Sequence, residues 1–212
     1  MNVILLGYPG AGKGTLAVKL KEKYGFMHVS TGDLIRGEIA SGTALGLKIK
    51  ALTSQGNLVS DEDTIQLLKN AIEGRQGNIV YDGFPRTLNQ AKVLDAYLAE
   101  QGKKIDYIVL LNMAEDAVLK RLTSRRLCKV CGAIYNIYSP DFKNICTKDG
   151  GELITRADDT LESAKHRFEV FKKETYPLIA YYQESPGFRQ VDGSGTPDEV
   201  LVLVEQALGL VK

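Results

Sequence analysis

Long apolar stretches, an excess of either charge and a dispersed set of cysteines are all missing from this chain of 212 residues. No segment approaches the roughly 20 apolar residues that a membrane-spanning helix needs, and the first apolar run is too short for a signal peptide. The 27 basic and 26 acidic residues leave a formal charge of +1, which argues against a broad nucleic-acid or membrane-binding surface. Anions must therefore be bound by local clusters of cations, and we expect a cytoplasmic protein.

Cysteine is scarce, and its three positions are clustered. Cys128, Cys131 and Cys146 fall in one short segment, and an odd, clustered set suits a metal better than disulfides. With Asp149 the pattern becomes C-x-x-C followed by C-x-x-D, which offers three thiolates and one carboxylate to a tetrahedral Zn²⁺. Asp141 is an alternative fourth ligand, and free structural thiols or a redox pair are alternatives to a metal.

A glycine-rich segment near the beginning of the chain predicts a phosphate site. Residues 7–15 read GYPGAGKGT and directly follow the apolar run Val3–Leu6. Glycines let backbone N–H groups converge on phosphate oxygens, and the following helix adds its positive dipole end. Lys13 supplies a charge for the β and γ phosphates. Gly14 follows the lysine where most P-loops have Ser or Thr, and Thr15 comes one place later. The alternative is an ordinary glycine turn.

The hydrophobic pattern alternates between strands and helices, which predicts an α/β fold with a doubly wound, parallel, five-stranded sheet flanked by helices. The expected strands are Val3–Leu6, Met27–Ser30, Asn78–Tyr81, Tyr107–Leu111 and Phe188–Val191. The expected helices are Lys13–Tyr24, Asp61–Glu73, Leu88–Gln101, Glu115–Ser124, Leu161–Glu184 and Pro197–Leu208. Such sheets bind ligands at the carboxyl ends of their strands, where Gly7, Ser30 and Asp82 are expected.

Two segments interrupt this alternation. Residues 30–59 are polar and helical, and residues 126–157 contain the cysteines; neither has the long buried element of a core. We expect both to be small inserted domains at the ligand edge of the sheet, and hence moving parts. The core P-loop domain would then comprise residues 1–29, 60–125 and 158–212.

A second motif, DGFPR at residues 82–86, follows the third expected strand. A carboxylate at a strand end beside a P-loop suits Mg²⁺ through water, and we assign Asp82 this role. Arg86 can form a bidentate contact with a phosphate, and Gln90, one helical turn later, could contact a base edge. The alternative for Asp82 is a turn residue before Gly83.

Together with Ser30–Arg36 (STGDLIR), these motifs resemble the adenylate kinase family over essentially the whole chain. The resemblance implies the reaction MgATP + AMP ⇌ 2 ADP in a monomer whose partners are ATP, AMP and ADP. It implies an AMP site formed by Thr31, Arg36, Asn57, Leu58, Val59, Gly83, Arg86, Gln90, Arg156 and Arg167. It implies an ATP site formed by Gly10, Ala11, Gly12, Lys13, Gly14, Thr15, Arg121, Arg125 and Thr196. The implied catalytic cations are Lys13, Arg86, Arg121, Arg125, Arg156 and Arg167.

The family resemblance also implies a lid that carries the cysteine segment. Bacterial members have a long lid with four cysteines or three cysteines and Asp, so the Zn²⁺ would be structural and closed to substrate. In the family Asp158 and Asp159 help to fasten the closed lid; here they are equally suited to begin the helix that follows. His28 is expected to be an ordinary strand residue, and His166 a surface residue rather than a zinc ligand.

The chemistry agrees with a phosphate acceptor. Phosphoryl transfer requires positioned cations, and a phosphate acceptor, already ionised at neutral pH, requires no catalytic base. Each arginine by itself would be read as a surface residue, so the joint pattern carries the assignment. Three rival functions remain: a UMP/CMP kinase, a nucleotide-sensing zinc module, and a P-loop ATPase that uses water. Gln90 and the long lid argue against the first rival, and the acceptor-site arginines argue against the second. The third would not need a second nucleotide pocket.

Overall fold

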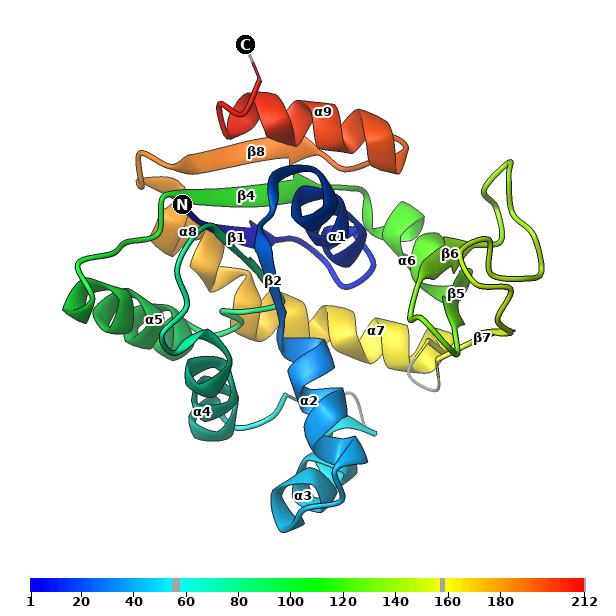
Figure 1. Ribbon diagram of the computed structural model, residues 1–212, viewed down its shortest axis with the longest axis horizontal. Coiled ribbons are helices and arrows are strands. Elements are labelled where there is room, and N and C mark those ends of the chain that lie inside the picture. The colour runs from blue at the N-terminus through cyan, green and yellow to red at the C-terminus, as the bar shows by residue number, and fades with distance from the viewer. Residues whose placement is uncertain (55–57, 157–158, 212) are drawn as a thin grey trace.

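The computed structural model describes residues 1–54, 58–156 and 159–211, and its centre is a five-stranded parallel sheet with the order β2-β3-β1-β4-β8 (Figure 1). The strands are β1 (Asn2–Leu6), β2 (Met27–Ser30), β3 (Ile79–Asp82), β4 (Tyr107–Asn112) and β8 (Phe188–Asp192). Ser30 of β2 and Leu5 of β1 both pair with Asp82 of β3. The register therefore brings the carboxyl ends of these strands to one edge of the sheet.

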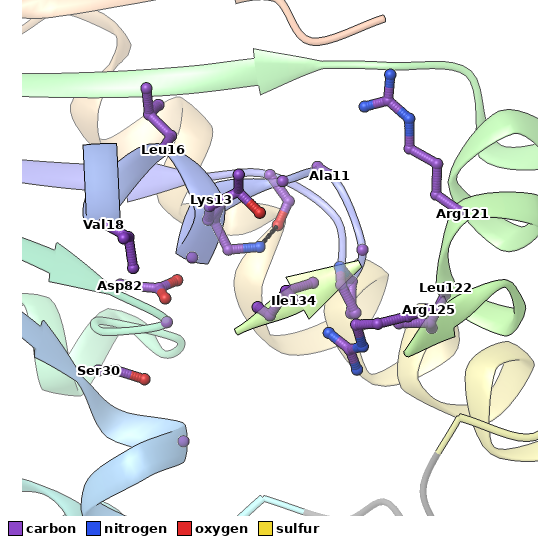
Figure 2. Close-up of a pocket in the computed structure, with 18 of the residues that line it drawn as sticks. Ala11, Lys13, Leu16, Val18, Ser30, Asp82, Arg121, Leu122, Arg125 and Ile134 are labelled. Atoms are coloured by element: carbon purple, nitrogen blue, oxygen red, sulfur yellow. Dashed lines mark hydrogen bonds between the residues drawn. The ribbon is translucent and has the colours of Figure 1, made fainter. Parts of the chain in front are cut away.

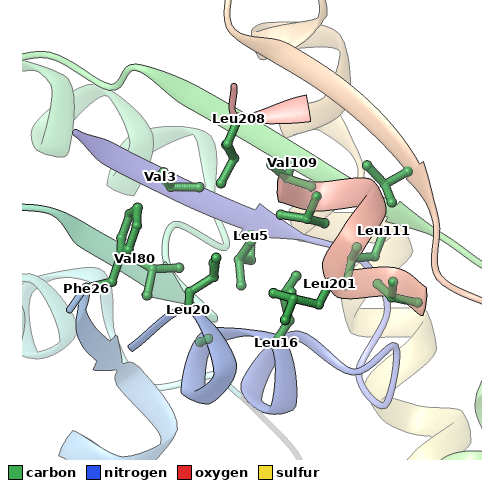
Figure 3. Close-up of a cluster of buried hydrophobic side chains, with 14 of the residues drawn as sticks. Val3, Leu5, Leu16, Leu20, Phe26, Val80, Val109, Leu111, Leu201 and Leu208 are labelled. Carbon is green, nitrogen blue, oxygen red and sulfur yellow. The ribbon is translucent and has the colours of Figure 1, made fainter. Parts of the chain in front are cut away.

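Helices cover both faces of the sheet, as expected for the predicted α/β fold. They are α1 (Lys13–Tyr24), α4 (Asp61–Ile72), α5 (Leu88–Glu100), α6 (Glu115–Thr123), α7 (Leu161–Val170), α8 (Pro177–Gln183) and α9 (Pro197–Ala207). Because side chains alternate along a strand, Val3 and Leu5 of β1 pack in the cluster with α1 and α9 that Figure 3 shows. Ile4 and Leu6 pack in the opposite cluster with α4, α5 and α8. A strand buried on both faces explains the unbroken apolar run.

One predicted helix is wrong as drawn from the sequence. The expected helix Leu161–Glu184 is divided into α7, a π-helical segment η1 (Phe171–Thr175) and α8. Pro177 begins α8, and its missing N–H and bulky ring prevent a regular helical bond to the carbonyl of Lys173. The chain instead forms a wider turn, in which the N–H of Tyr176 donates to the carbonyl of Phe171 at 2.8 Å. The other predicted elements of the core agree with the structure within one residue at each end.

The two interrupting segments form their own small structures. The first contains α2 (Thr31–Ala40) and α3 (Ala44–Thr53). The two helices approach closely because Gly46 has no Cβ atom that would clash with the Glu38 carbonyl. The second contains a three-stranded antiparallel sheet, β5 (Arg125–Cys128), β6 (Ile134–Asn136) and β7 (Leu153–Ile154), with the order β6-β5-β7. In Figure 1 both project away from the five-stranded sheet, at different places. In the described parts of the chain, every helix is too short or too polar to cross a membrane.

Candidate active site

A cleft with a volume of about 1690 Å³ lies at the carboxyl ends of β1, β2 and β3. In Figure 2 Lys13 and Asp82 lie on one side of it, and Arg121 and Arg125 lie on the other. The predicted site residues that line it are Gly10, Ala11, Gly12, Lys13, Gly14, Thr15, Arg36, Leu58, Asp82, Gly83, Arg86, Arg121, Arg125, Arg156, Arg167 and Thr196. Thr31, Val59 and Gln90 are buried beside it. Asn57 lies outside the described residues.

The glycine-rich segment wraps around the side chain of its own lysine. Gly12 has φ 97° and precedes the first residue of α1, a left-handed conformation that glycine adopts without strain. The ammonium of Lys13 donates hydrogen bonds to the carbonyls of Gly7 at 2.7 Å and Tyr8 at 2.9 Å. The loop therefore holds the positive charge at the N-terminus of α1, where backbone N–H groups are also free of helical partners.

The electrostatic surroundings of Lys13 are strongly positive. Burial, together with the nearby guanidinium groups of Arg86, Arg167 and Arg125, lowers the pKa of the Lys13 ammonium to about 8. Asp82 opposes this shift. Burial likewise lowers the pKa of Arg86 to about 10, and the positive charge of Arg167 contributes to this shift. Four cations gathered in one cleft are a site for a polyanion.

Asp82 lies at the end of β3, close to the beginning of α1. A Cβ atom at Gly14 would stand 3.2 Å from Asp82 Oδ2, so glycine at this position leaves room for the carboxylate. This contact gives a physical reason for the departure from the general P-loop pattern. His28 Nε2 lies 3.2 Å from the same Oδ2 atom. From the sequence His28 is expected to be an ordinary strand residue; its contact with Asp82 joins two strands that are distant in the sequence, so no local pattern indicates it.

The acceptor side is built around the DGFPR motif. Thr31 Oγ1 and Arg86 Nε both donate to the carbonyl of Gly83 at 2.8 Å. The side chain of Gln90 accepts from the Arg86 backbone N–H at 2.8 Å and donates to Asp61 at 2.8 Å. Gln90 thus fixes the turn that presents Arg86. Nearby, Arg36 of α2 forms an ion pair with Asp33 one helical turn earlier.

Buried Asp159 holds two of the predicted cations. Its carboxylate accepts from Arg125 Nε at 2.7 Å and also from Arg125 Nη2, and it lies 3.7 Å from Arg167 Nη1. Thr160, not Asp159, is the N-cap of α7, because its side chain accepts from the N–H of Ser163. Of the two roles open to Asp159 in the sequence, the structure shows ion pairing. Asp158 lies outside the described residues.

Arg121 is held by main-chain carbonyls. It donates to the carbonyls of Gly193, Ser194 and Gly195 at 2.6–2.9 Å, in the loop between β8 and α9. Thr196 caps α9 in a reciprocal arrangement with Glu199, which fixes the end of this loop. The loop and the arginine together form one end of the cleft.

The cysteine segment forms a compact ligand cluster. Cys128, Cys131, Cys146 and Asp149 each bring one ligand atom within 4.8 Å of the others. Cys131 Sγ and Cys146 Sγ are 3.6 Å apart, close to the roughly 3.8 Å that two sulfurs span across a tetrahedral zinc with 2.3 Å bonds. The donor set and its spacing therefore fit a metal ion. Asp149, and not Asp141, belongs to this group of ligand atoms, so Asp149 is the better fourth ligand.

The backbone around this cluster supports metal binding. The N–H groups of Val130 and Cys131 point at Cys128 Sγ from 3.4 and 3.5 Å, a contact that stabilises a thiolate. A Cβ atom at Gly151 would lie 2.8 Å from Cys128 Sγ and 2.9 Å from Asp149 Oδ1. Hydrogen bonds from the Cys146 and Cys131 thiols lower the pKa of the Asp149 carboxyl, so the carboxylate is ionised.

Comparison with known proteins agrees with this geometry. The protein family described as "Adenylate kinase" matches residues 5–186. Adenylate kinase from Bacillus subtilis is 42% identical over 100% of both chains, and the one from Geobacillus sp. is 42% identical over 99% of both. Adenylate kinase from Archaeoglobus fulgidus is 44% identical over 100% of both chains. The chain belongs to the adenylate kinase family. The protein is therefore an enzyme of nucleotide phosphoryl transfer, and the five-stranded parallel sheet predicted from the alternating hydrophobic pattern is confirmed.

Proposed function

We propose that the enzyme transfers the terminal phosphoryl group of MgATP to AMP, reversibly and in line, to give two ADP. The observation that carries this proposal is the convergence of Lys13, Arg86, Arg125 and Arg167 in one cleft, where the three arginines each lower the pKa of Lys13. A phosphoryl group in transfer spreads negative charge over its oxygens, and fixed cations stabilise that charge at no cost of reorganisation.

The donor nucleotide is proposed to lie along the glycine-rich segment. The N–H groups of residues 10–15 and the Lys13 ammonium hold its phosphates, and Arg121 and Arg125 contact them from the opposite wall. The base end would face the loop that Arg121 binds, next to Thr196. Mg²⁺ that enters with ATP neutralises phosphate charge, and Asp82 would hold its water ligands.

The acceptor is proposed to lie between α2 and the DGFPR turn. Arg36, Leu58 and Arg86 line this end of the cleft, and Thr31, Gly83 and Val59 shape it from behind. Arg156 and Arg167 would contact both nucleotides at the point of transfer. The base contact of Gln90 stays a prediction, because its amide here bonds Asp61 and the Arg86 backbone.

The reaction needs no proton acceptor. The second pKa of a phosphate monoester is about 6, so the acceptor oxygen is already ionised at neutral pH. Water is the competing acceptor, and excluding it protects ATP. We propose that residues 30–59 and 126–157 close over the cleft for this purpose, as the two predicted insertions.

We propose that Cys128, Cys131, Cys146 and Asp149 bind structural Zn²⁺. All four positions of a tetrahedral site would be occupied by protein, which leaves no position for substrate. Zinc binding would supply folding energy to a segment with a very small apolar core. The cytoplasmic location and the monomeric state stay predictions.

The test is ADP formation from MgATP with AMP, UMP, CMP or GMP as acceptor, and with no acceptor as control. Fast turnover with AMP alone is the expected result. Turnover with a pyrimidine nucleotide would retain the mechanism and move the substrate to UMP or CMP. Turnover without any acceptor would indicate an ATPase, and the absence of turnover with bound nucleotide would indicate a sensing module.

A further inference from the structure

An aromatic residue of the glycine-rich segment packs against the helix that carries Arg167. The ring of Tyr8 lies edge-on to Phe168, with centroids 5.1 Å apart, and tilted over Phe171, with centroids 4.6 Å apart. Phe168 and Phe171 are both buried, and their spacing of three places them on one face of the α7–η1 segment. The three rings form a cluster that joins the P-loop to this segment, and we refer to them as the Tyr8 cluster.

The backbone of Tyr8 is part of the lysine's anchor. Its carbonyl accepts from Lys13 Nζ at 2.9 Å and from the N–H of Ala11 at 3.1 Å. A shift of Tyr8 would therefore move the hydrogen-bond acceptor that orients the Lys13 ammonium. Because the ring and the carbonyl belong to one residue, the packing of the ring restricts the position of the carbonyl relative to α7.

The other side of the cluster determines where Arg167 stands. Phe168 directly follows Arg167, and Phe171 is the first residue of the π-helical segment η1. A π-helical turn changes the rotation of the helix and is frequent at functional sites. Here it begins at the residue that contacts Tyr8, so the ring contact and the change of helix geometry coincide.

A mechanical link is needed because the groups that it positions repel each other. Arg167 and Lys13 are both cations, and the charge of Arg167 contributes to the low pKa of Lys13. The carboxylate of Asp159, which also pairs with Arg125, offsets part of the positive charge of Arg167. Repulsion therefore favours separation of the P-loop from α7, and the Tyr8 cluster opposes it.

We propose that Tyr8 is a positioning residue for phosphoryl transfer. Its ring, packed between Phe168 and Phe171, sets the placement of Lys13 relative to Arg167 across the transferred phosphoryl group. The proposal rests on the roles given above to Lys13 and Arg167. It adds a residue that touches neither nucleotide and acts through the two cations.

The test compares Tyr8→Ala with Tyr8→Phe in single-turnover, rapid-quench measurements with MgATP and AMP. Tyr8→Ala is expected to slow the chemical step by about 10- to 100-fold, because small misplacements of reacting groups are that costly. The KM values for ATP and AMP should stay within about threefold, since the phosphate-binding groups remain. Tyr8→Phe retains the ring and should restore the rate to within about twofold of wild type.

Tyr181→Ala is the matched control. Tyr181 also packs edge-on against an aromatic ring, Tyr182, at 4.9 Å, but it lies on α8 and bonds Asp95 outside the cleft. It should leave the rate unchanged. A full rate in Tyr8→Ala, or an equal loss in Tyr8→Phe, would overturn the proposal.

A double variant tests whether Tyr8 and Phe171 act through one shared contact. Phe171→Leu keeps an apolar side chain of similar volume and should slow the chemical step through the same cluster. In the double variant Tyr8→Ala/Phe171→Leu, the chemical step should be slowed by less than the product of the two single-variant factors, because both substitutions break the same ring contact. Independent, multiplying effects would refute the shared cluster. A wild type without AMP-dependent turnover would overturn the proposed function and this proposal together, whereas active wild type with fully active Tyr8→Ala would overturn this one alone.

Discussion

The two sheets of this protein are held together by different means. In the five-stranded sheet, Val3, Ile4 and Val109 are fully buried, and apolar clusters cover both faces. Across residues 126–156, which surround the three-stranded sheet, the buried residues are Cys128 and Cys146. One region therefore folds by burying apolar surface. The other has too little apolar surface to do so and gathers metal ligands at its centre.

This difference separates stability from catalysis in a way that can be tested. Lys13, Asp82 and Arg86 stand on the hydrophobic region, whereas the residues that would cover them belong to the ligand-centred region. Changes in the first region should affect chemistry or global stability. Changes in the second should affect local folding first.

The largest effect is expected for Lys13→Ala. Removal of a cation that stabilises transition-state charge should lower kcat by at least about a hundredfold while both sheets stay folded. Lys21→Ala, an exposed lysine on the same helix, is the matched control and should keep kcat unchanged. Steady-state kinetics and circular dichroism measure the two properties. An active Lys13→Ala would remove Lys13 from the catalytic groups.

Truncation of an aliphatic side chain should distinguish the regions directly. Leu94→Ala in α5 removes a side chain that is 1% exposed and should cost about 2–5 kcal/mol of unfolding free energy. Ile145→Ala, at a side chain in the cysteine segment that is 50% exposed, should cost less than about 1 kcal/mol. Urea denaturation of both variants measures the difference. Equal losses would contradict the contrast between the regions.

Metal removal should affect the three-stranded sheet far more than the five-stranded sheet. A zinc chelator should lower the melting temperature by about 2–8 °C, as expected for a loss of roughly 1–2 kcal/mol. Hydrogen exchange should accelerate in residues 126–156 and remain slow in β1 and β4. Asp149→Asn should weaken metal retention, and Asp141→Asn, the matched change at the alternative ligand, should not. Unchanged exchange after verified metal loss would exclude a structural metal.

The smallest expected effect is the uptake of a fraction of a proton when ATP binds. Since the pKa of Lys13 is about 8, about half of the free enzyme has a neutral Lys13 at pH 8, and ATP phosphates would restore the charge. Binding should then take up about half a proton, which calorimetry in buffers of different ionisation enthalpy measures. Lys13→Gln should abolish this uptake. Between pH 8 and 10.5, the shift increases the stability of the free enzyme with pH, because the unfolded chain holds that proton longer.

Local signals made much of the fold predictable. The bounds of α1 and β2 follow from the sequence, because glycine stands next to both ends of α1 and the apolar periodicity changes there. The π-helical segment was missed although Pro177 marked it, because the apolar pattern continues past the proline. The contacts of His28 with Asp82 and of Gln90 with Asp61 were not predictable, because they join elements that are distant in the sequence.

The ion pair of Arg125 with Asp159 has a further consequence for the segment between them. These two residues lie at its beginning and end, so their contact holds the two ends of a long segment together. A segment whose ends are held together has fewer unfolded conformations, so it loses less conformational entropy when it refolds. Melting of this segment should therefore be a local and readily reversed excursion, which the parallel sheet beneath it does not share.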